Sequence, residues 1–225
     1  MKKTKPRIPE GGAIEDGPQI TMEQYSEIMK EQLGREYLRF ADNVIKKVNP
    51  ALNSRVLEIG PGPGWAGIYL LEKRNDLKLV GLDPSPDMIR VASRNALKEG
   101  LHEIAYTHGS AENMSKFNDG TFNLVISRDS LHHWEDPEKV FKEIKRVLKP
   151  DGNLYIHDSR RDMNFPGRML VTILSRFIPK NMGYYWRTSV AASYTPEEVR
   201  GMLDNNGLND WSVESEMMDL IILRN

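Results

Sequence analysis

The chain has 225 residues, with 31 Lys or Arg against 32 Asp or Glu and a formal net charge of −1. This length suits one ordinary domain with its own core, and the balanced charge gives no overall electrostatic footprint for nucleic acid or a membrane surface. The chain contains no cysteine, which excludes disulfides, thiolate metal sites and a cysteine nucleophile.

The N-terminal stretch 1–20 is rich in lysine, proline and glycine. Such a composition cannot bury a core, so we expect a flexible tail over 1–20 and a single domain over 21–225. No apolar segment follows the lysines, which predicts no signal peptide, and no apolar run is long enough to cross a bilayer. The expected location is the cytoplasm.

A helix is expected to begin at Thr21, because Thr21 and Gln24 have the spacing of a capping box. Apolar residues then recur at helical spacing as far as Val48. Gly34 is a candidate for a break that would divide this segment into two helices.

The segment 55–67 reads as a short strand, a glycine-rich turn and the start of a helix. Open α/β sheets bind nucleotide-like ligands at such a turn, because glycines let the backbone turn sharply and approach a ligand closely. Gly62, Gly64 and Gly67 spell the dinucleotide fingerprint G-x-G-x-x-G.

The register of that fingerprint is wrong. It should begin where the strand ends, at Gly60, and this puts Trp65 in place of the third glycine. Pro61 and Pro63 also lack the N–H donors that a pyrophosphate needs. The loop therefore favours a nucleoside ligand without phosphates.

Strands and helices alternate through the rest of the chain. Helices are expected after N-cap residues at Ser85, Asp136 and Thr195. A turn is expected at 149–152. Strands are expected at 77–82, 104–107, 122–127 and 154–157, with a terminal hairpin at 211–216 and 218–223.

The run Glu58-x-Gly60-x-Gly62-x-Gly64 resembles motif I of the class I S-adenosylmethionine (SAM) dependent methyltransferases. Further motifs of this family follow in order at 81–85, 109–112, 125–128, 131–134 and 148–152. The resemblance implies an α/β fold: a Rossmann-like, doubly wound, mostly parallel seven-stranded sheet with a terminal antiparallel strand and helices on both faces. It also implies SAM as methyl donor and S-adenosylhomocysteine as product.

The resemblance assigns cofactor roles to several positions. Glu58 would hold the methionine amino end, Asp83 would accept the ribose hydroxyls, and Ser110 stands where relatives usually carry an adenine-binding Asp, so the Ala111 N–H is the firmer adenine contact. Tyr25 would lie either over SAM or in the core. The remaining cofactor-side positions are Gly60, Gly62, Gly64, Pro84, Met88, Glu112, Ser127 and Arg128.

Two adjacent histidines follow the strand at 122–127. Adjacent residues point in different directions, so one of them is expected to face the methyl group as a general base. We choose His133 as the catalytic residue and place His132 and Asp158 on the acceptor side. The alternative is that these histidines pack against or cap the next helix. A His-His-Asp metal site is disfavoured by the adjacent spacing, so no metal is expected.

Residues 159–194 form an insert with aromatic side chains that include Tyr184 and Tyr185. They would line the pocket of a small-molecule acceptor, or form a lid or a homodimer surface. The sequence 127–130 lacks the Asn/Asp-Pro-Pro-aromatic motif of similar nucleic-acid methyltransferases, so we expect neither a nucleic-acid nor a membrane partner. The alternatives to a methyltransferase are a SAM-binding protein without transferase activity and a NAD-linked oxidoreductase.

Overall fold

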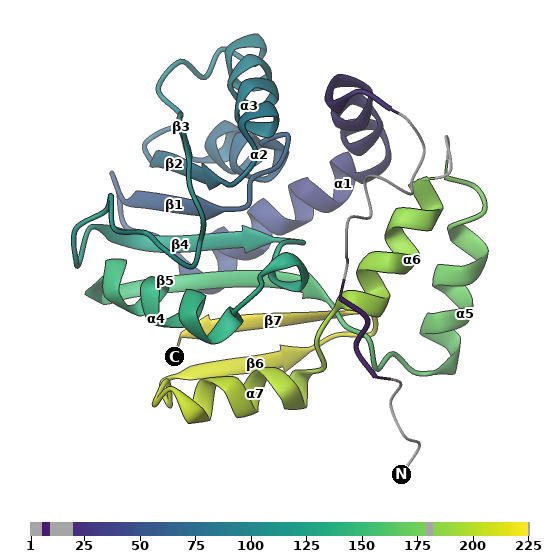
Figure 1. The fold of residues 1–225 in the computed structure, drawn as a ribbon. Coiled ribbons are helices and arrows are strands. Elements are labelled where there is room, and N and C mark those ends of the chain that lie inside the picture. Colours follow the sequence, from purple (N-terminus) through teal and green to yellow (C-terminus); the bar gives the residue numbers. More distant parts are fainter. Residues whose placement is uncertain (1–5, 10–19, 179–181, 225) are drawn as a thin grey trace.

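A computed structural model describes residues 6–9, 20–178 and 182–224. Its centre is a seven-stranded sheet in the order β3-β2-β1-β4-β5-β7-β6 (Figure 1). β7 runs antiparallel to both of its neighbours, and the other pairs are parallel. The strands are β1 (Arg55–Ile59), β2 (Lys78–Asp83), β3 (Ala105–His108), β4 (Phe122–Arg128), β5 (Leu148–Ser159), β6 (Trp211–Ser215) and β7 (Asp219–Arg224). The predicted fold class is confirmed.

Helices cover both faces of the sheet, as Figure 1 shows, with α1, α2 and α3 on one face and α4 and α7 on the other. α5 and α6 lie beyond the carboxyl ends of the parallel strands. The helices are α1 (Met22–Val48), α2 (Trp65–Lys73), α3 (Pro86–Lys98), α4 (Pro137–Val147), α5 (Phe165–Leu174), α6 (Met182–Ala192) and α7 (Pro196–Asn205), with the 3-10 helix η1 (Leu131–His133) after β4.

The strands divide their side chains between two cores. Val56 packs in the cluster with α1 and α2, whereas its neighbour Leu57 packs in the cluster with α4 and α7. Val125 and Ile126 of β4 alternate in the same way. Successive side chains of a strand point to opposite faces, so a sheet covered on both sides needs apolar residues at consecutive positions.

The predicted helix starts agree with the structure. Thr21 and Thr195 each form a capping box, and Ser85 and Asp136 each accept a bond from a backbone N–H of the first helical turn. The predicted break at Gly34 is wrong, because α1 is one helix from Met22 to Val48. Gly34 packs near α2, and tertiary packing outweighs the intrinsic cost of a helical glycine, about 1 kcal/mol.

The turn predicted at 149–152 is also wrong. Those residues belong to β5, which begins at Leu148. The pairing of β4 with β5 starts at Phe122 and Leu148, then shifts register before Leu124 pairs with Asn153. The extra residues form an irregularity within the strand, so the Pro-Asp-Gly sequence marks a bulge and not a strand end.

The described part of the predicted tail, residues 6–9, lies against the domain. Ile8 N–H donates to the carbonyl of Ala191 at 3.1 Å, and Arg7 donates to the carbonyls of Ala192 and His132. The Arg7 guanidinium also lies 4.3 Å from the Tyr194 ring centroid. These contacts join residues 6–9 to the domain, and the rest of the stretch expected to be a flexible tail lies outside the described residues, apart from Ile20.

Candidate active site

The loop between β1 and α2 turns through three glycines with positive φ, at Gly60, Gly62 and Gly64. L side chains rarely adopt this backbone, which explains the glycines. A Cβ at Gly60 would lie 2.1 Å from Ser130 Oγ, so the loop touches the segment after β4. A Cβ at Gly62 would meet nothing within 4 Å, so the loop has open space on that side.

Asp83 at the end of β2 holds this loop in place. Its Oδ2 accepts from the Gly62 N–H at 3.0 Å and its Oδ1 accepts from the Ser85 N–H at 2.8 Å. Burial raises the pKa of Asp83, against the opposing effect of these two hydrogen bonds. The predicted ribose carboxylate therefore lies beside the glycine loop, at the carboxyl edge of the sheet.

Glu58 lies beneath the loop and is only 2% exposed. Its Oε1 accepts from the Gly67 N–H at 3.0 Å. Its Oε2 is buried and has no hydrogen-bond partner among the described residues. Burial raises the pKa of Glu58 to about 8, and the charge of Asp83 adds to this effect. A cationic ligand group nearby would stabilise the ionised carboxylate.

The segment after β3 carries the positions expected near adenine. The Ser110 hydroxyl donates to Glu112 Oε2 and accepts from the Glu112 N–H at 3.1 Å. Glu112 Oε1 accepts from the Glu135 N–H at 3.2 Å, which joins this turn to the segment after η1. Ala111 is buried and Met88 half-buried, whereas Pro84 is exposed.

The segment after β4 leaves the sheet beside the glycine loop. The Ser127 hydroxyl donates to the carbonyl of Ile59 at 2.9 Å, which ties β4 to the end of β1. The buried Arg128 side chain lies over the Tyr37 ring, with its Nε 3.1 Å from Asp129 Oδ2. Burial works to raise the pKa of Asp129, but the charges of Arg128 and His157 outweigh it and lower this pKa.

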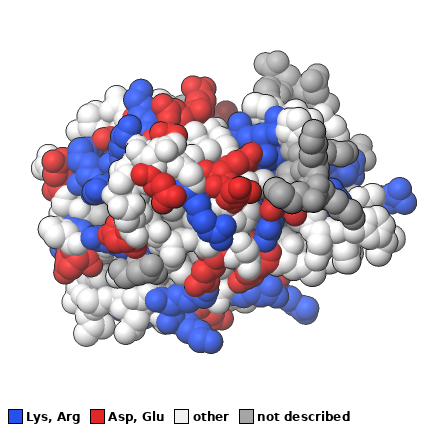
Figure 2. Space-filling view, turned by 90° about the horizontal axis from the view of Figure 1, so that it is seen from below, with Lys and Arg blue, Asp and Glu red and all other residues white. Residues whose placement is uncertain are grey.

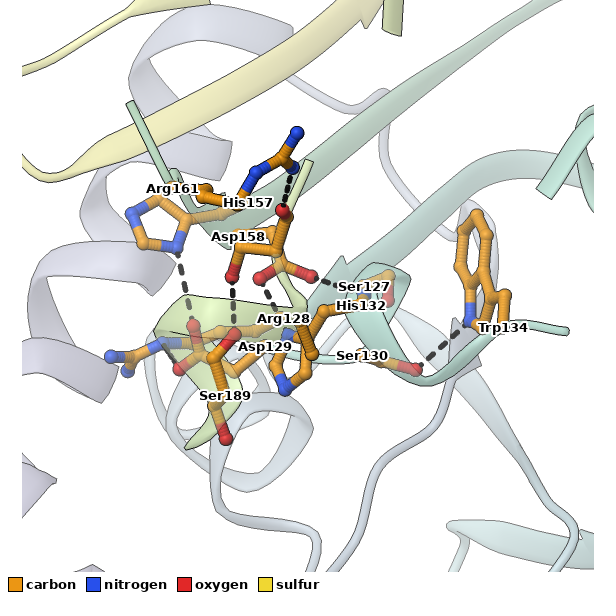
Figure 3. A network of polar contacts seen from close by, with 12 residues as sticks. Ser127, Arg128, Asp129, Ser130, His132, Trp134, His157, Asp158, Arg161 and Ser189 are labelled. Atoms are coloured by element: carbon orange, nitrogen blue, oxygen red, sulfur yellow. Dashed lines mark hydrogen bonds and ion pairs between the residues drawn. The ribbon is translucent and has the colours of Figure 1, made fainter. Parts of the chain in front are cut away.

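His132, on the segment after β4, and Asp158, on β5, form a buried pair (Figure 3). The His132 Nδ1 lies 2.7 Å from Asp158 Oδ1, and the His132 backbone N–H donates to Asp158 Oδ2 at 3.0 Å. His133 is exposed, and its ring centroid lies 4.1 Å from that of His132. The two histidines therefore point to different surroundings.

A cavity of about 270 Å³ lies between α1, the segment after β4, the ends of β5 and β7, and α6. One part of its wall is apolar or aromatic and another part is polar. The apolar and aromatic residues are Tyr25, Ile28, Met29, Leu33, Ile178, Met182, Tyr185, Trp186 and Met218. The polar residues are Gln32, Glu36, Arg128, Asp129, His132, His133, His157, Ser159, Ser189 and Asp219.

The cavity gathers some of the predicted site residues and not others. Tyr25, Arg128, His132, His133 and Tyr185 line it. Tyr184, which is 40% exposed, and Asp158, which is buried and bonded to His132, are not among the residues of the wall. The roles assigned to these residues stay predictions.

Sequence reasoning missed His157 and Asp219. The His157 Nε2 lies 3.7 Å from Asp219 Oδ2, and its Nδ1 lies 4.0 Å from Asp129 Oδ1. Burial raises the pKa of Asp219 to about 6. The sequence signal that could have found Asp219 is the predicted antiparallel strand, because the start of that strand must lie opposite the end of β5. The observed register pairs Asp219 with Ser159.

In the described ranges, no group of three or more His, Asp or Glu side chains is arranged to hold a metal ion. Asp136 caps α4 and Asp158 is bonded to His132. None of the helices in those ranges combines the length and apolar character that crossing a membrane requires.

The strand order, the glycine loop after β1 and the buried carboxylate at the end of β2 define a Rossmann-like fold of the methyltransferase type. Residues 57–156 match the family model described as "Methyltransferase domain". This match assigns the segment 57–156 to the class I SAM-dependent methyltransferases, a family of enzymes with SAM as cosubstrate.

Known relatives agree with this assignment. The chain is 26% identical over 208 residues to a demethylmenaquinone methyltransferase of Bacteroides fragilis, covering 89% of this chain and 83% of that protein. It is 31% identical over 115 residues to YcgJ of Bacillus subtilis, described as an uncharacterized methyltransferase; this match covers 51% of this chain and only 44% of YcgJ. A candidate SAM-dependent methyltransferase from Methanococcus maripaludis has a similar fold, with a TM-score of 0.74 and 24% sequence identity. This match covers 100% of the present chain and 96% of the other.

The residues present fit SAM. Open space beside Gly62 leaves room for a ligand against the loop backbone. The buried Glu58 Oε2, which has no partner among the described residues, suits a cationic amino group. Asp83 Oδ1 and Oδ2 each accept one N–H bond and keep lone pairs for ribose hydroxyls.

Proposed function

We propose that the chain transfers the methyl group of SAM to a small organic acceptor bound in the cavity between α1 and α6. The observation that carries this proposal is the position of His132, which lines the cavity and is bonded to the buried Asp158 behind it. Ser130, two residues before His132, contacts Gly60. The acceptor side and the cofactor side would therefore meet at the segment after β4.

SAM, when bound, supplies a methyl group on a sulfonium, which an in-line nucleophile displaces. Glu58 and Asp83 would orient the two ends of the cofactor. The cavity wall would hold the acceptor in line, and such alignment lowers a barrier by up to about 7–11 kcal/mol. The new bond forms from the acceptor's lone pair as the carbon–sulfur bond breaks, and the electron pair of that bond stays on sulfur.

His132 would accept the acceptor's proton if its nucleophilic atom carries one. Asp158 is a carboxylate that accepts, so the Nδ1 of His132 carries the hydrogen of their bond and Nε2 is the basic nitrogen. This arrangement of a histidine oriented by a buried aspartate is suited to general-base catalysis. It favours His132 over the His133 predicted from the sequence, because the His132 ring is buried against Asp158, whereas the His133 side chain is exposed.

The cavity wall supports an acceptor with an apolar ring or chain and one polar group. Trp186, Tyr185 and Met182 of α6 face Ile28 and Met29 of α1 across it. Such walls exclude water and bind apolar surface. The name of the Bacteroides fragilis relative gives demethylmenaquinone, which has an apolar chain and ring, as that protein's acceptor.

The test is a screen that follows S-adenosylhomocysteine release from SAM with phenols, hydroquinones, amines, thiols and carbon acids. We expect release that depends on one acceptor class, and loss of that release in Asp83→Ala protein purified in the same way. Saturable SAM binding without acceptor-dependent release over the whole panel would instead favour a SAM-binding protein without transferase activity.

A further inference from the structure

Helix α5 has its small residues inside and its large apolar residues outside. Gly167, Val171 and Ser175, four residues apart, face inward and are buried. Phe165 is 65% exposed, Met169 49% and Ile173 43%, and Phe177, just beyond the helix, is 79% exposed. A surface helix ordinarily buries its large apolar stripe, so this orientation calls for a partner outside the described fold.

The orientation of α5 is fixed by close packing on α6. A Cβ at Gly183 would lie 1.7 Å from the carbonyl oxygen of Ser175, so the two backbones approach as closely as a glycine allows. The Arg187 Nη1 also donates to Ser175 Oγ at 2.8 Å. The outward stripe therefore cannot roll inward without breaking these contacts.

The charge around this stripe is one-sided. The segment 163–196 contains no Asp or Glu, and its described part carries Arg168, Arg176 and Arg187, although the whole chain has slightly more acidic than basic residues. Arg168 is exposed beside Phe165 and Met169, and these three line one groove together with Ile8. Figure 2 shows acidic (red) and basic (blue) side chains intermixed over most of the face it presents. At the right-hand end, where α5 lies in Figure 1, the described residues are only basic (blue) or uncharged (white).

We propose that the outward face of α5 docks the protein on the surface of an anionic lipid bilayer. Exposed aromatic and aliphatic side chains next to arginines, without acidic neighbours, are the pattern of helices that lie in the headgroup region. A second copy of the chain fits this face poorly, since a twofold interface would bring the arginines of one copy against the arginines of the other.

Docking of this face would act close to the acceptor cavity. α6 carries Met182, Tyr185 and Trp186 in the cavity wall and Arg187 and Val190 in the groove beside α5. One helix thus separates the lipid-facing groove from the acceptor. The docking proposal does not depend on the proposed methyl transfer, because it rests on α5 alone.

The experiment is co-sedimentation of the full chain with vesicles of phosphatidylcholine containing about one quarter phosphatidylglycerol, compared with vesicles of phosphatidylcholine alone. We expect binding to the anionic vesicles that is at least about tenfold stronger than to neutral ones and that weakens as salt is added. Equal or absent binding to both kinds of vesicle would overturn the proposal.

Two variants test the face itself. Phe165→Ser with Phe177→Ser, and Arg168→Glu with Arg176→Glu, should each reduce binding by about tenfold or more. The matched controls are Leu52→Ser, at a side chain 77% exposed, and Arg39→Glu, at a side chain 69% exposed, which should bind like the parent protein. A thermal shift with S-adenosylhomocysteine in every variant shows that the fold is kept. If the double phenylalanine variant does not fold, the double arginine variant alone decides the test.

Two outcomes contradict the proposal. Vesicle binding that survives in both α5 variants places the contact elsewhere on the chain. Light scattering gives the other outcome. If the parent protein has the mass of a dimer and the variant Phe165→Ser with Phe177→Ser has the mass of a monomer, a second copy of the chain occupies this face.

Discussion

Asp158 binds His132 twice, accepting from the ring Nδ1–H at 2.7 Å and from the backbone N–H at 3.0 Å. Both residues are almost fully buried, at 1% and 3% exposed. One carboxylate therefore fixes the rotation of the imidazole and the backbone of the 3-10 helix that carries it. This relationship joins the end of β5 to the segment after β4, and residues of both line the cavity.

His132→Gln should lower the turnover number by about 100- to 10,000-fold with an acceptor that loses a proton, because general bases contribute this much. Asp158→Asn should lower it too, since an amide no longer favours the required tautomer. S-adenosylhomocysteine affinity, measured by calorimetry, should stay unchanged in both variants.

His133→Gln is the matched control for that prediction. Its side chain is exposed, so turnover should change by less than about threefold if His132 is the base. The opposite pattern, a severe loss in His133→Gln with a mild one in His132→Gln, would return the catalytic role to His133.

Asp83→Ala should weaken S-adenosylhomocysteine binding by roughly 1–3 kcal/mol, because it removes the ribose acceptor and leaves the Gly62 N–H without its bond. Isothermal titration measures this loss. Asp87→Ala is the control, because Asp87 is an exposed acid in the first turn of α3, shortly after Asp83 in the chain, and pairs with Arg90. Unchanged affinity in folded Asp83→Ala protein would leave Asp83 with only its role in bracing the loop.

Local features could be predicted from the sequence. The capping boxes at Thr21 and Thr195 depend on residues three positions apart, and the glycine loop depends on backbone angles that its own residues determine. The sheet followed from the resemblance and from apolar strands between helices. These features need no knowledge of distant contacts.

The rest of the site depends on distant contacts. Arg7 donates to the carbonyl of His132 across 125 positions of sequence, and Asp219 reaches His157 only because β7 pairs with β5. The choice between His132 and His133 likewise rested on which of them meets Asp158. No local pattern encodes these pairings, so the sequence alone led to His133, and the bond of His132 to Asp158 became visible only in the folded chain.

Gly60→Ala should destabilise the fold strongly, by about 3 kcal/mol or more, because the new Cβ would lie 2.1 Å from Ser130 Oγ on a backbone with φ of 64°. Gly62→Ala meets no neighbour within 4 Å and should cost about 1–2 kcal/mol from the backbone alone. Urea denaturation of both variants without ligand measures the difference. Equal losses would mean that the contact with Ser130 relaxes freely.

Glu58 should link both stability and ligand binding to pH. The pKa of Glu58 in the folded state is about 8, above its usual value. At a pH between the usual and the folded-state pKa, the unfolded chain has released the Glu58 proton, whereas the folded chain keeps it. Stability without ligand should therefore fall as pH rises through this window, with a contribution of up to about 1.4 kcal/mol per pH unit. Glu58→Gln should remove this contribution, as denaturation at a series of pH values would show.

Binding of S-adenosylhomocysteine tests the role of Glu58 directly. If its amino group lies near Glu58, binding lowers that pKa and releases a proton near neutral pH. Calorimetry in two buffers of different ionisation enthalpy counts this proton. The same count in Glu58→Gln protein would show that the proton comes from another group.

Tyr185 and Tyr184 are neighbours with different surroundings, and this difference tests where the acceptor binds. Tyr185 lines the cavity, whereas Tyr184 is 40% exposed and lies outside its wall. Tyr185→Ala removes an aromatic wall and should raise the acceptor KM by about tenfold or more, with S-adenosylhomocysteine affinity unchanged. Tyr184→Ala should change the acceptor KM by less than about threefold. Equal effects in the two variants, together with an altered molecular mass by light scattering, would instead make this segment a surface between two copies of the chain.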